Sequence, residues 1–297
     1  MASPDPPNPP TLSHLLSSFS SFLTVSIHSI LYLRDLYPST TFLTAKAYNY
    51  PVHQSRHPKV CEWVTDAVAA VEEQLLKGLT TAVEIGKERD TGRNTRVERV
   101  VLVIFGPVPV ESASQTDYGM SFGDSFADSE PEYQIKPLER YIFDTSRFPI
   151  IPSRQQHTPF NDPAESTDQP SERQVIDLEE QFRAILSSLD QRTSRLSPLP
   201  KDSTFTIAIE LADEASAPLK HPQAWIPVEP GMQRRKLTED ADIDTQILGI
   251  TDGKEGEDIR GDERKVTPIR AVEAGEMVFE MWIEESKAKK LLKENEG

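Results

Sequence analysis

The stretch FLTVSIHSILYLRDLYPSTTFLTAKAYNYPVHQSRHP, residues 22–58, decides the fold of this chain. It begins inside a run of apolar residues that recur at steps of three and four from Leu12 onward, and this spacing predicts a long amphipathic helix. The helix is predicted to stop at Tyr37, because the residue before a proline is disfavoured in helices. A short extended segment at 42–50 follows. A second helix is predicted to start at Pro58, since a proline in the first turn loses no hydrogen bond.

The first helix is apolar over so wide an arc that we expect it to be buried on most sides, as the central helix of the fold. Thr11 or Ser13 can cap its N-terminus. The most apolar run, 22–33, is interrupted by polar residues and is shorter than the ~20 residues that cross a bilayer, so we expect no membrane span. The apolar positions are Leu12, Leu15, Leu16, Phe19, Phe22, Leu23, Ile27, Ile30 and Leu31.

Composition restricts the class of protein. The chain has 297 residues, with 24 prolines against 13 glycines and a formal net charge of -16 at pH 7. The clumped prolines predict one ordered domain that carries long disordered insertions. The acidic charge argues against direct binding to nucleic acid, which needs a basic face. Cys61 is the only cysteine, which excludes an intrachain disulfide and suits a reducing, intracellular compartment.

The rest of the chain predicts further strands and one more helix. Residues 97–105 are β-branched and apolar, as in a central strand, and 138–144 are predicted to be its hairpin partner. Residues 204–211 alternate in the manner of a half-buried strand. The remaining predicted elements are a helix at 174–191, strands at 266–269 and 277–283, and a charged tail from 286, with a frayed helix as the alternative for the tail. Polar or charged stretches at 106–137, 152–172 and 231–264 are predicted to be disordered insertions.

Five dispersed segments resemble one known family in their order and spacing. They are FLTVSIHSILYLRDLYP at 22–38, KAYNYPVHQSRHP at 46–58, STFTIAIEL at 203–211, AWIPVEP at 224–230 and TPIRAVEAGEMVFEMWIEES at 267–286. These segments are similar to the HORMA-domain family, in the branch of accessory, non-catalytic subunits of translesion DNA polymerase zeta. The resemblance covers 12–286 apart from the insertions, and leaves 1–11 as a disordered N-terminus and 287–297 as a charged tail.

The resemblance implies both a fold and a way of working. The fold would be α+β, with three helices packed on a mainly antiparallel sheet. A C-terminal seat belt, about 212–285, would wrap around a partner peptide that adds to a sheet edge. The expected protein is a nuclear, non-catalytic adaptor without cofactors. It would trap a Pro-containing peptide of the polymerase zeta catalytic subunit and bridge it to the scaffold deoxycytidyl-transferase polymerase, and a remodelling ATPase could open its belt.

Three aromatic residues are carried over from the family as peptide-binding positions. Trp225, in the Pro-flanked AWIPVEP segment, is expected to pack on the prolines of the bound peptide, although it could instead anchor its loop to the core. Trp63 stands where the family usually has tyrosine, so the ring is kept and the hydroxyl is lost. Plain core packing is the alternative for Trp63. Tyr37 also matches a family tyrosine, and a structural role is favoured there.

Four further residues are carried over as protein–protein contacts. Arg183 aligns with an arginine used for HORMA–HORMA homo- or heterodimers, and the alternative is an exposed ion pair with Glu179 four residues earlier. Val266, Glu280 and Trp282 occupy the positions that contact the scaffold polymerase. The family has leucine, glutamine and tyrosine there, so this contact is expected to be altered. A Trp282 ring facing solvent would indicate an interface, and one facing inward would be core.

Other chemistry finds little support in the sequence. The six histidines show no metal-ligand spacing, and no Cys/His cluster accompanies them. No phosphate-binding or nucleophile motif is present. Two alternatives stay open. One is a spindle-checkpoint or meiotic HORMA protein with a different client peptide. The other is a small enzyme on an unfamiliar α+β scaffold, which would need a pocket of convergent titratable groups.

Overall fold

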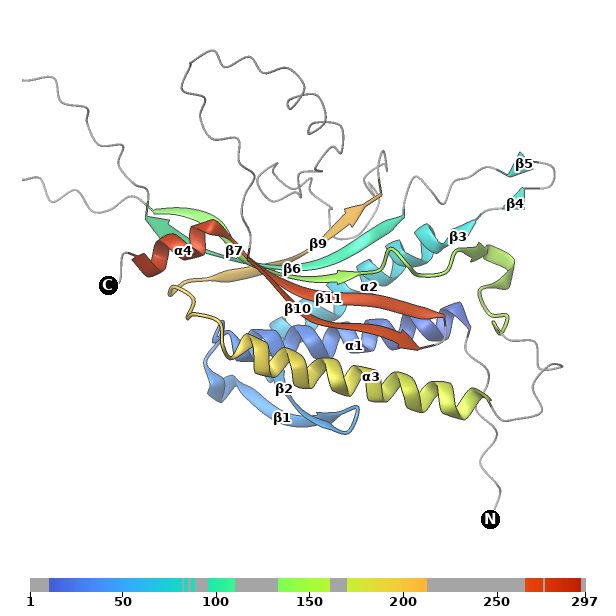
Figure 1. Ribbon diagram of the computed structural model, residues 1–297, viewed down its shortest axis with the longest axis horizontal. Coiled ribbons are helices and arrows are strands. Elements are labelled where there is room, and N and C mark those ends of the chain that lie inside the picture. Colours follow the sequence, from blue (N-terminus) through green and yellow to red (C-terminus); the bar gives the residue numbers. More distant parts are fainter. Residues whose placement is uncertain are drawn as a thin grey trace, which may run out of the picture.

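The structure is a computed structural model that describes residues 11–81, 83–84, 87–88, 96–109, 133–160, 170–212, 265–274 and 276–294. Three long helices lie on one face of a five-stranded antiparallel sheet, and a small hairpin packs on the helices from the other side (Figure 1). The predicted α+β class is therefore confirmed. The main elements are α1 Leu12–Leu33, β1 Phe42–Ala47, β2 Tyr50–Ser55, α2 Pro58–Leu79, β6 Val97–Pro109, β7 Tyr133–Asp144, α3 Pro170–Thr193, β9 Thr204–Leu211, β10 Lys265–Ala274, β11 Met277–Glu285 and α4 Lys287–Glu294. Short elements are η1 Ser39–Thr41, β3 Thr80–Thr81, β4 Val83–Glu84, β5 Lys87–Glu88, β8 Ile151–Pro152 and η3 Ser153–Gln155.

Helix α1 forms the centre of the fold, as its sequence predicts. Thr11 is the N-cap, and its hydroxyl accepts a hydrogen bond from the backbone N–H of His14 at 3.2 Å. Thr11 is therefore part of the helix cap and not of a disordered N-terminus. Among the described residues, α1 is the one helix long and apolar enough to span a membrane, but 67% of that window is buried inside the fold. Such burial is the property of a core helix.

The segment predicted as one extended stretch at 42–50 is instead a two-stranded hairpin. Strands β1 and β2 pair antiparallel from Phe42 opposite Ser55 to Ala47 opposite Tyr50. The turn between them places Tyr48 and Asn49 at φ values of 49° and 58°. This left-handed region is costly for residues other than glycine, although asparagine tolerates it best. The sequence does not predict this turn, because the turn contains no glycine.

The large sheet has the strand order β10-β11-β7-β6-β9, so β9 and β10 are its two edges. The central pair, β6 and β7, is longer than predicted and takes in residues 106–109 and 133–137. These residues were wrongly assigned to a disordered insertion, of which 110–132 lie outside the described residues. Helix α3 likewise begins at Pro170, inside the second predicted insertion. The third predicted insertion, 231–264, lies wholly outside the described residues.

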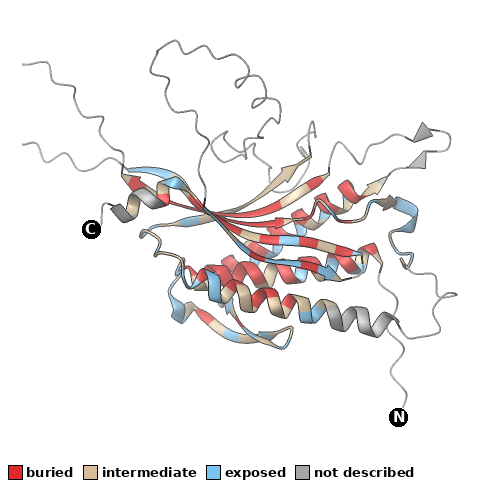
Figure 2. Ribbon diagram, in the orientation of Figure 1, coloured by how far each residue is buried: buried red, intermediate tan, exposed pale blue. Residues whose placement is uncertain are grey.

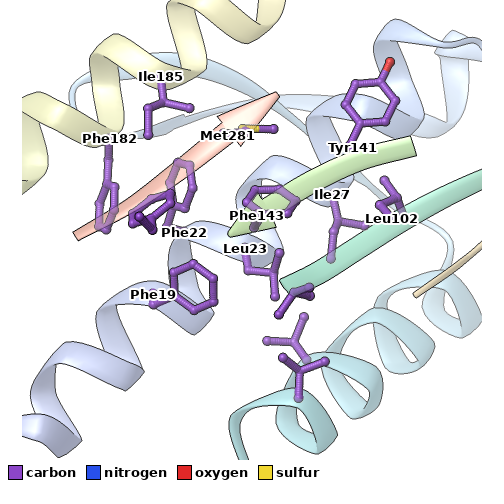
Figure 3. Packing of buried hydrophobic residues seen from close by; sticks show 14 of the residues in the cluster. Phe19, Phe22, Leu23, Ile27, Leu102, Tyr141, Phe143, Phe182, Ile185 and Met281 are labelled. Atoms are coloured by element: carbon purple, nitrogen blue, oxygen red, sulfur yellow. The ribbon is translucent and has the colours of Figure 1, made fainter. Parts of the chain in front are cut away.

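The core fills the space between the helices and the sheet. Buried residues concentrate on α1 and on the sheet face that it contacts (Figure 2). At its centre, Phe22 stacks on Phe182 of α3, with ring centroids 4.4 Å apart and planes 11° apart. Phe22 also meets Phe143 of β7 edge-on at 6.3 Å. Figure 3 shows these rings between α1, α3 and the sheet. Aromatic contacts thus join the central helix to both of its neighbours.

We predict that Gly106→Ala lowers the free energy of unfolding by about 1–3 kcal/mol. A Cβ atom at this position would lie 2.6 Å from Leu138 Cδ1, 2.8 Å from Ser203 Oγ and 2.9 Å from Pro200 Cγ. Leu138 is fully buried, so it has little room to move. Chemical denaturation monitored by circular dichroism measures the change. Glu280→Ala, at an exposed strand position, is the control and should leave stability within about 0.5 kcal/mol.

Candidate peptide-binding edge and partner surface

Strand β9 offers an edge to which an extended peptide could add. Within the described part of the chain, β9 pairs with β6 alone, from Val97 opposite Leu211 to Phe105 opposite Thr204. Its apolar side chains pack against the core but are only partly buried. They are Phe205, Ile207, Ile209 and Leu211. An edge strand of this kind presents unpaired backbone groups beside apolar side chains, as β-strand addition requires.

Three aromatic side chains meet at one end of this edge. The ring of Trp63, from α2, lies edge-on to Phe205 with centroids 5.1 Å apart. Tyr37, which follows α1, is edge-on to the same ring at 6.4 Å. Burial raises the pKa of the Tyr37 hydroxyl. All three rings are partly buried, so the cluster packs on the core while part of its surface stays accessible.

The structure thus brings Trp63 and Tyr37 together and adds Phe205, which sequence reasoning missed. The alternation of apolar residues along 204–211 contained the signal, because it assigns Phe205 to the face that packs on the helices. Trp63 packs on the core with part of its ring accessible, and its peptide-binding role stays a prediction. Trp225 lies outside the described residues, and its role stays a prediction.

The opposite edge of the sheet is formed by the β10–β11 hairpin. Strand β11 docks on β7, from Glu280 opposite Asp144 to Glu285 opposite Glu139. The chain therefore leaves the sheet at one edge, after β9, and re-enters it at the other. The connecting residues, 213–264, lie outside the described part.

Val266, Glu280 and Trp282 share the outer face of this hairpin, away from the helices. Pro268 pairs with Trp282 and Ala271 with Glu280, while Val266 is 55% exposed. Trp282 is half-buried, because it packs against a small second cluster on the outer face of the sheet. That cluster consists of Val101, Val103, Phe105 and Ile142. The three predicted positions therefore form one surface, and the Trp282 ring is neither core nor fully exposed.

Charged side chains hold this outer face in place. The indole N–H of Trp282 donates to Glu284 Oε1 at 3.0 Å, and Glu284 Oε2 accepts from Arg140 at 3.1 Å. Arg140 in turn pairs with Glu210, which also pairs with Arg99 at 3.0 Å. These contacts connect β11, β7, β6 and β9 across the sheet. They fix the orientation of the Trp282 ring.

Arg183 lies on α3, and its side chain is 40% exposed. It pairs with Glu180, three residues earlier, at 3.5 Å. The sequence suggested an ion pair between Arg183 and Glu179, but the structure pairs Arg183 with Glu180. Residues three apart on a helix are adjacent, as are residues four apart. An exposed pair of this kind contributes little to stability. The ion pair leaves part of the Arg183 side chain accessible to a partner protein.

A metal site finds no support among the described residues. No group of three or more His, Cys, Asp or Glu side chains in the described part could hold a metal ion. His53 stacks on Tyr32 with ring centroids 3.5 Å apart, and burial lowers its pKa even though Asp190 acts in the opposite direction. His53 is thus used in packing. His57, four residues later, is the N-cap residue of α2.

Comparison with known proteins defines the class. The family model described as "HORMA domain" matches residues 16–247, and the chain belongs to this family. Among solved structures, a chain in the crystal structure of a mitotic checkpoint complex aligns with a TM-score of 0.53 at 12% identity, covering 93% of this chain and 97% of that one. That likeness is one of fold.

Curated relatives include a polymerase subunit and a spindle-checkpoint protein. The DNA polymerase zeta processivity subunit of Schizosaccharomyces pombe is 27% identical over 266 residues, which are 90% of each chain. Mitotic spindle assembly checkpoint protein MAD2B is 24% identical in Danio rerio and 22% identical in Homo sapiens, over 66% of this chain and 64% of each relative. These relatives include a processivity subunit of a DNA polymerase, and they support an adaptor role.

Proposed function

We propose that this protein is the non-catalytic adaptor of DNA polymerase zeta in translesion synthesis, acting in the nucleus. It traps a Pro-containing peptide of the catalytic subunit at β9 and presents the β10–β11 face to the scaffold deoxycytidyl-transferase polymerase. The similarity to the yeast processivity subunit over 90% of both chains supports the choice of complex. The observation that carries the binding site is the partly buried apolar edge of β9 with the Tyr37–Trp63–Phe205 cluster at its end.

The peptide adds to β9 as a further strand. Its backbone satisfies the open N–H and C=O groups of the edge, and its prolines stack on the aromatic cluster. The chain leaves the sheet at β9 and re-enters it at β10, and in this proposal the seat belt, about 212–285, wraps around the bound peptide as the family resemblance implies. Release then requires part of the belt to detach, which makes dissociation slow and gives a remodelling ATPase an element to act on.

The first test is binding to a Pro-containing peptide from the polymerase zeta catalytic subunit of the same organism. Wild type should bind tightly and release the peptide slowly. Trp63→Ala, Phe205→Ala and Trp225→Ala should each weaken binding by about 30-fold or more, as expected for aromatic hot spots. Biolayer interferometry measures both affinity and release.

The matched control is Trp282→Ala, which removes a tryptophan from the opposite edge of the sheet. It should keep the affinity for the peptide and lose binding to the C-terminal domain of the scaffold polymerase. A folded wild-type protein that binds no such peptide would contradict the polymerase assignment. Binding of a spindle-checkpoint or chromosome-axis peptide instead would identify the second candidate client.

We predict that Arg183→Ala reduces self-association and leaves peptide affinity unchanged. The guanidinium is half exposed on α3, and its ion pair with Glu180 is weak enough to be exchanged for a partner contact. Light scattering over a concentration series measures the oligomer mass. Glu180→Ala, which removes the ion pair and keeps the arginine, should retain self-association. An unchanged oligomer mass in Arg183→Ala would refute a dimer through this residue.

A further inference from the structure

A buried charge site joins the C-terminal helix to the centre of the fold. Glu139 of β7 is 0% exposed and lies 105 residues from Arg34, which donates to its two oxygens at 2.8 and 2.9 Å. The Tyr141 hydroxyl donates to Glu139 at 3.1 Å. Lys289 of α4 also contacts Glu139, and its side chain is 3% exposed. Lys289 further donates to Glu285, the last residue of β11, at 2.9 Å.

The four charged groups of this site, Arg34, Glu139, Glu285 and Lys289, balance one another. Burial opposes ionisation of Glu285, but its hydrogen bonds and charge contacts with Lys289 and Lys265 outweigh that cost and hold its pKa below the usual value. Two positive and two negative buried side chains thus share one site, and the exposed Lys265 also pairs with Glu285 at 3.1 Å. A buried ion site is tolerated only when its charges are paired and hydrogen-bonded.

Two of the four charged groups belong to the segment formed by β11 and α4, and the other two do not. Arg34 and Glu139 belong to the body of the fold, whereas Glu285 and Lys289 follow one another on β11 and α4. Four residues separate Glu285 from Lys289, a reach of at most about 14 Å. Lys289 therefore cannot remain at Glu139 when β11 leaves β7. In the undocked state, each half keeps its own neutral pair, Arg34–Glu139 in the body and Glu285–Lys289 at the helical (i, i+4) spacing.

We propose that α4 is a charge latch, in which entry of Lys289 beside Glu139 holds the β10–β11 hairpin docked on β7. Two backbone hydrogen bonds also hold the start of α4 beside β7. The N–H of Ser286 donates to the Leu138 carbonyl at 2.9 Å, and the N–H of Lys289 donates to the Ser286 carbonyl at 3.1 Å. Removing the Lys289 charge leaves Glu285 to be buried without its nearest cation. The docked hairpin then loses stability relative to the undocked one, while β6 and β9 keep their pairing.

The test is hydrogen–deuterium exchange of the full-length protein without any peptide. In Lys289→Met, the amides of β11 should exchange at least about tenfold faster, because Glu285 loses its buried cation and keeps only the exposed Lys265 as a partner. The amides of β6 and β9 should exchange as in wild type. Lys287→Met makes the same change two residues earlier at an exposed position, and it should change neither region. Lys289→Arg and the Lys289→Met/Glu285→Gln double variant should each recover protection of β11.

Unchanged protection of β11 in Lys289→Met would overturn the latch. So would loss of protection through the whole sheet, or failure to fold, since Lys289 would then be part of the common core. A second arm measures peptide release, which should accelerate in Lys289→Met. This arm alone rests on the proposed function. Faster exchange at β11 without any peptide binding would therefore support the latch and refute the client.

Discussion

Replacing Arg34 by methionine is expected to lower the free energy of unfolding by about 3–5 kcal/mol. Arg34 is buried at the end of α1, where its guanidinium makes two hydrogen bonds to Glu139 and a third, at 2.6 Å, to the Ser197 carbonyl after α3. Methionine fills a similar volume but leaves Glu139 and Glu285 with Lys289 as the one cation inside the site. The surplus buried negative charge is the source of the loss.

Urea denaturation followed by circular dichroism measures this loss. Arg56→Met is the matched control, because Arg56 is exposed, and it should change stability by less than about 0.5 kcal/mol. The Arg34→Met/Glu139→Gln double variant should be more stable than the sum of the single losses predicts, since the buried carboxylate is gone. A loss below about 1 kcal/mol in Arg34→Met would show that the site is hydrated and not dry.

Phe22→Ala is expected to cost about 3–5 kcal/mol, the second large effect. Phe22 is fully buried, and its ring contacts Phe182, Phe143, Phe279 and Tyr48. Alanine leaves a cavity between α1, α3 and the sheet that these rings cannot close (Figure 3). Thermal unfolding measures the change, and Phe22→Leu should lose much less because it fills most of the space.

Phe205→Ala provides the contrast that separates the core from the site. The Phe205 ring is only partly buried, so its loss should destabilise the fold less than Phe22→Ala. In the proposed function it should weaken peptide binding strongly. Equal stability losses in the two variants would assign Phe205 to the core and weaken the case for a binding edge at β9.

Proline explains why the strands of the large sheet were predicted too short. Pro107, Pro109 and Pro137 made 106–137 look like a loop, yet all three lie in β6 or β7. They are tolerated because β9 stops pairing at Phe105 and β11 stops at Glu139. Beyond these points, β6 and β7 pair only with each other among the described strands, and prolines are tolerated on such edge strands. Strand ends of this kind depend on neighbours that sequence cannot reveal.

The C-terminal tail is a second region where the sequence alone does not predict the tertiary contacts. Residues 287–297 read as a charged tail, because lysine and glutamate dominate them. The structure forms α4 there and buries Lys289 beside Glu139, which is 150 residues away in sequence. A buried lysine is exceptional among lysines, so composition predicts the opposite. Tertiary pairing reverses that expectation.

Local physical chemistry in the sequence determined the long elements. The spacing of apolar residues and the cap at Thr11 defined α1, Pro58 defined the start of α2, and alternation defined β9. The tertiary structure decided which surfaces these elements share: the meeting of Trp63 and Tyr37 with Phe205, the common face of Val266, Glu280 and Trp282, and the buried charge site. Periodicity acts over a few residues and can be read along the chain. Contacts between residues a hundred positions apart exist only once the sheet brings its edges and helices together.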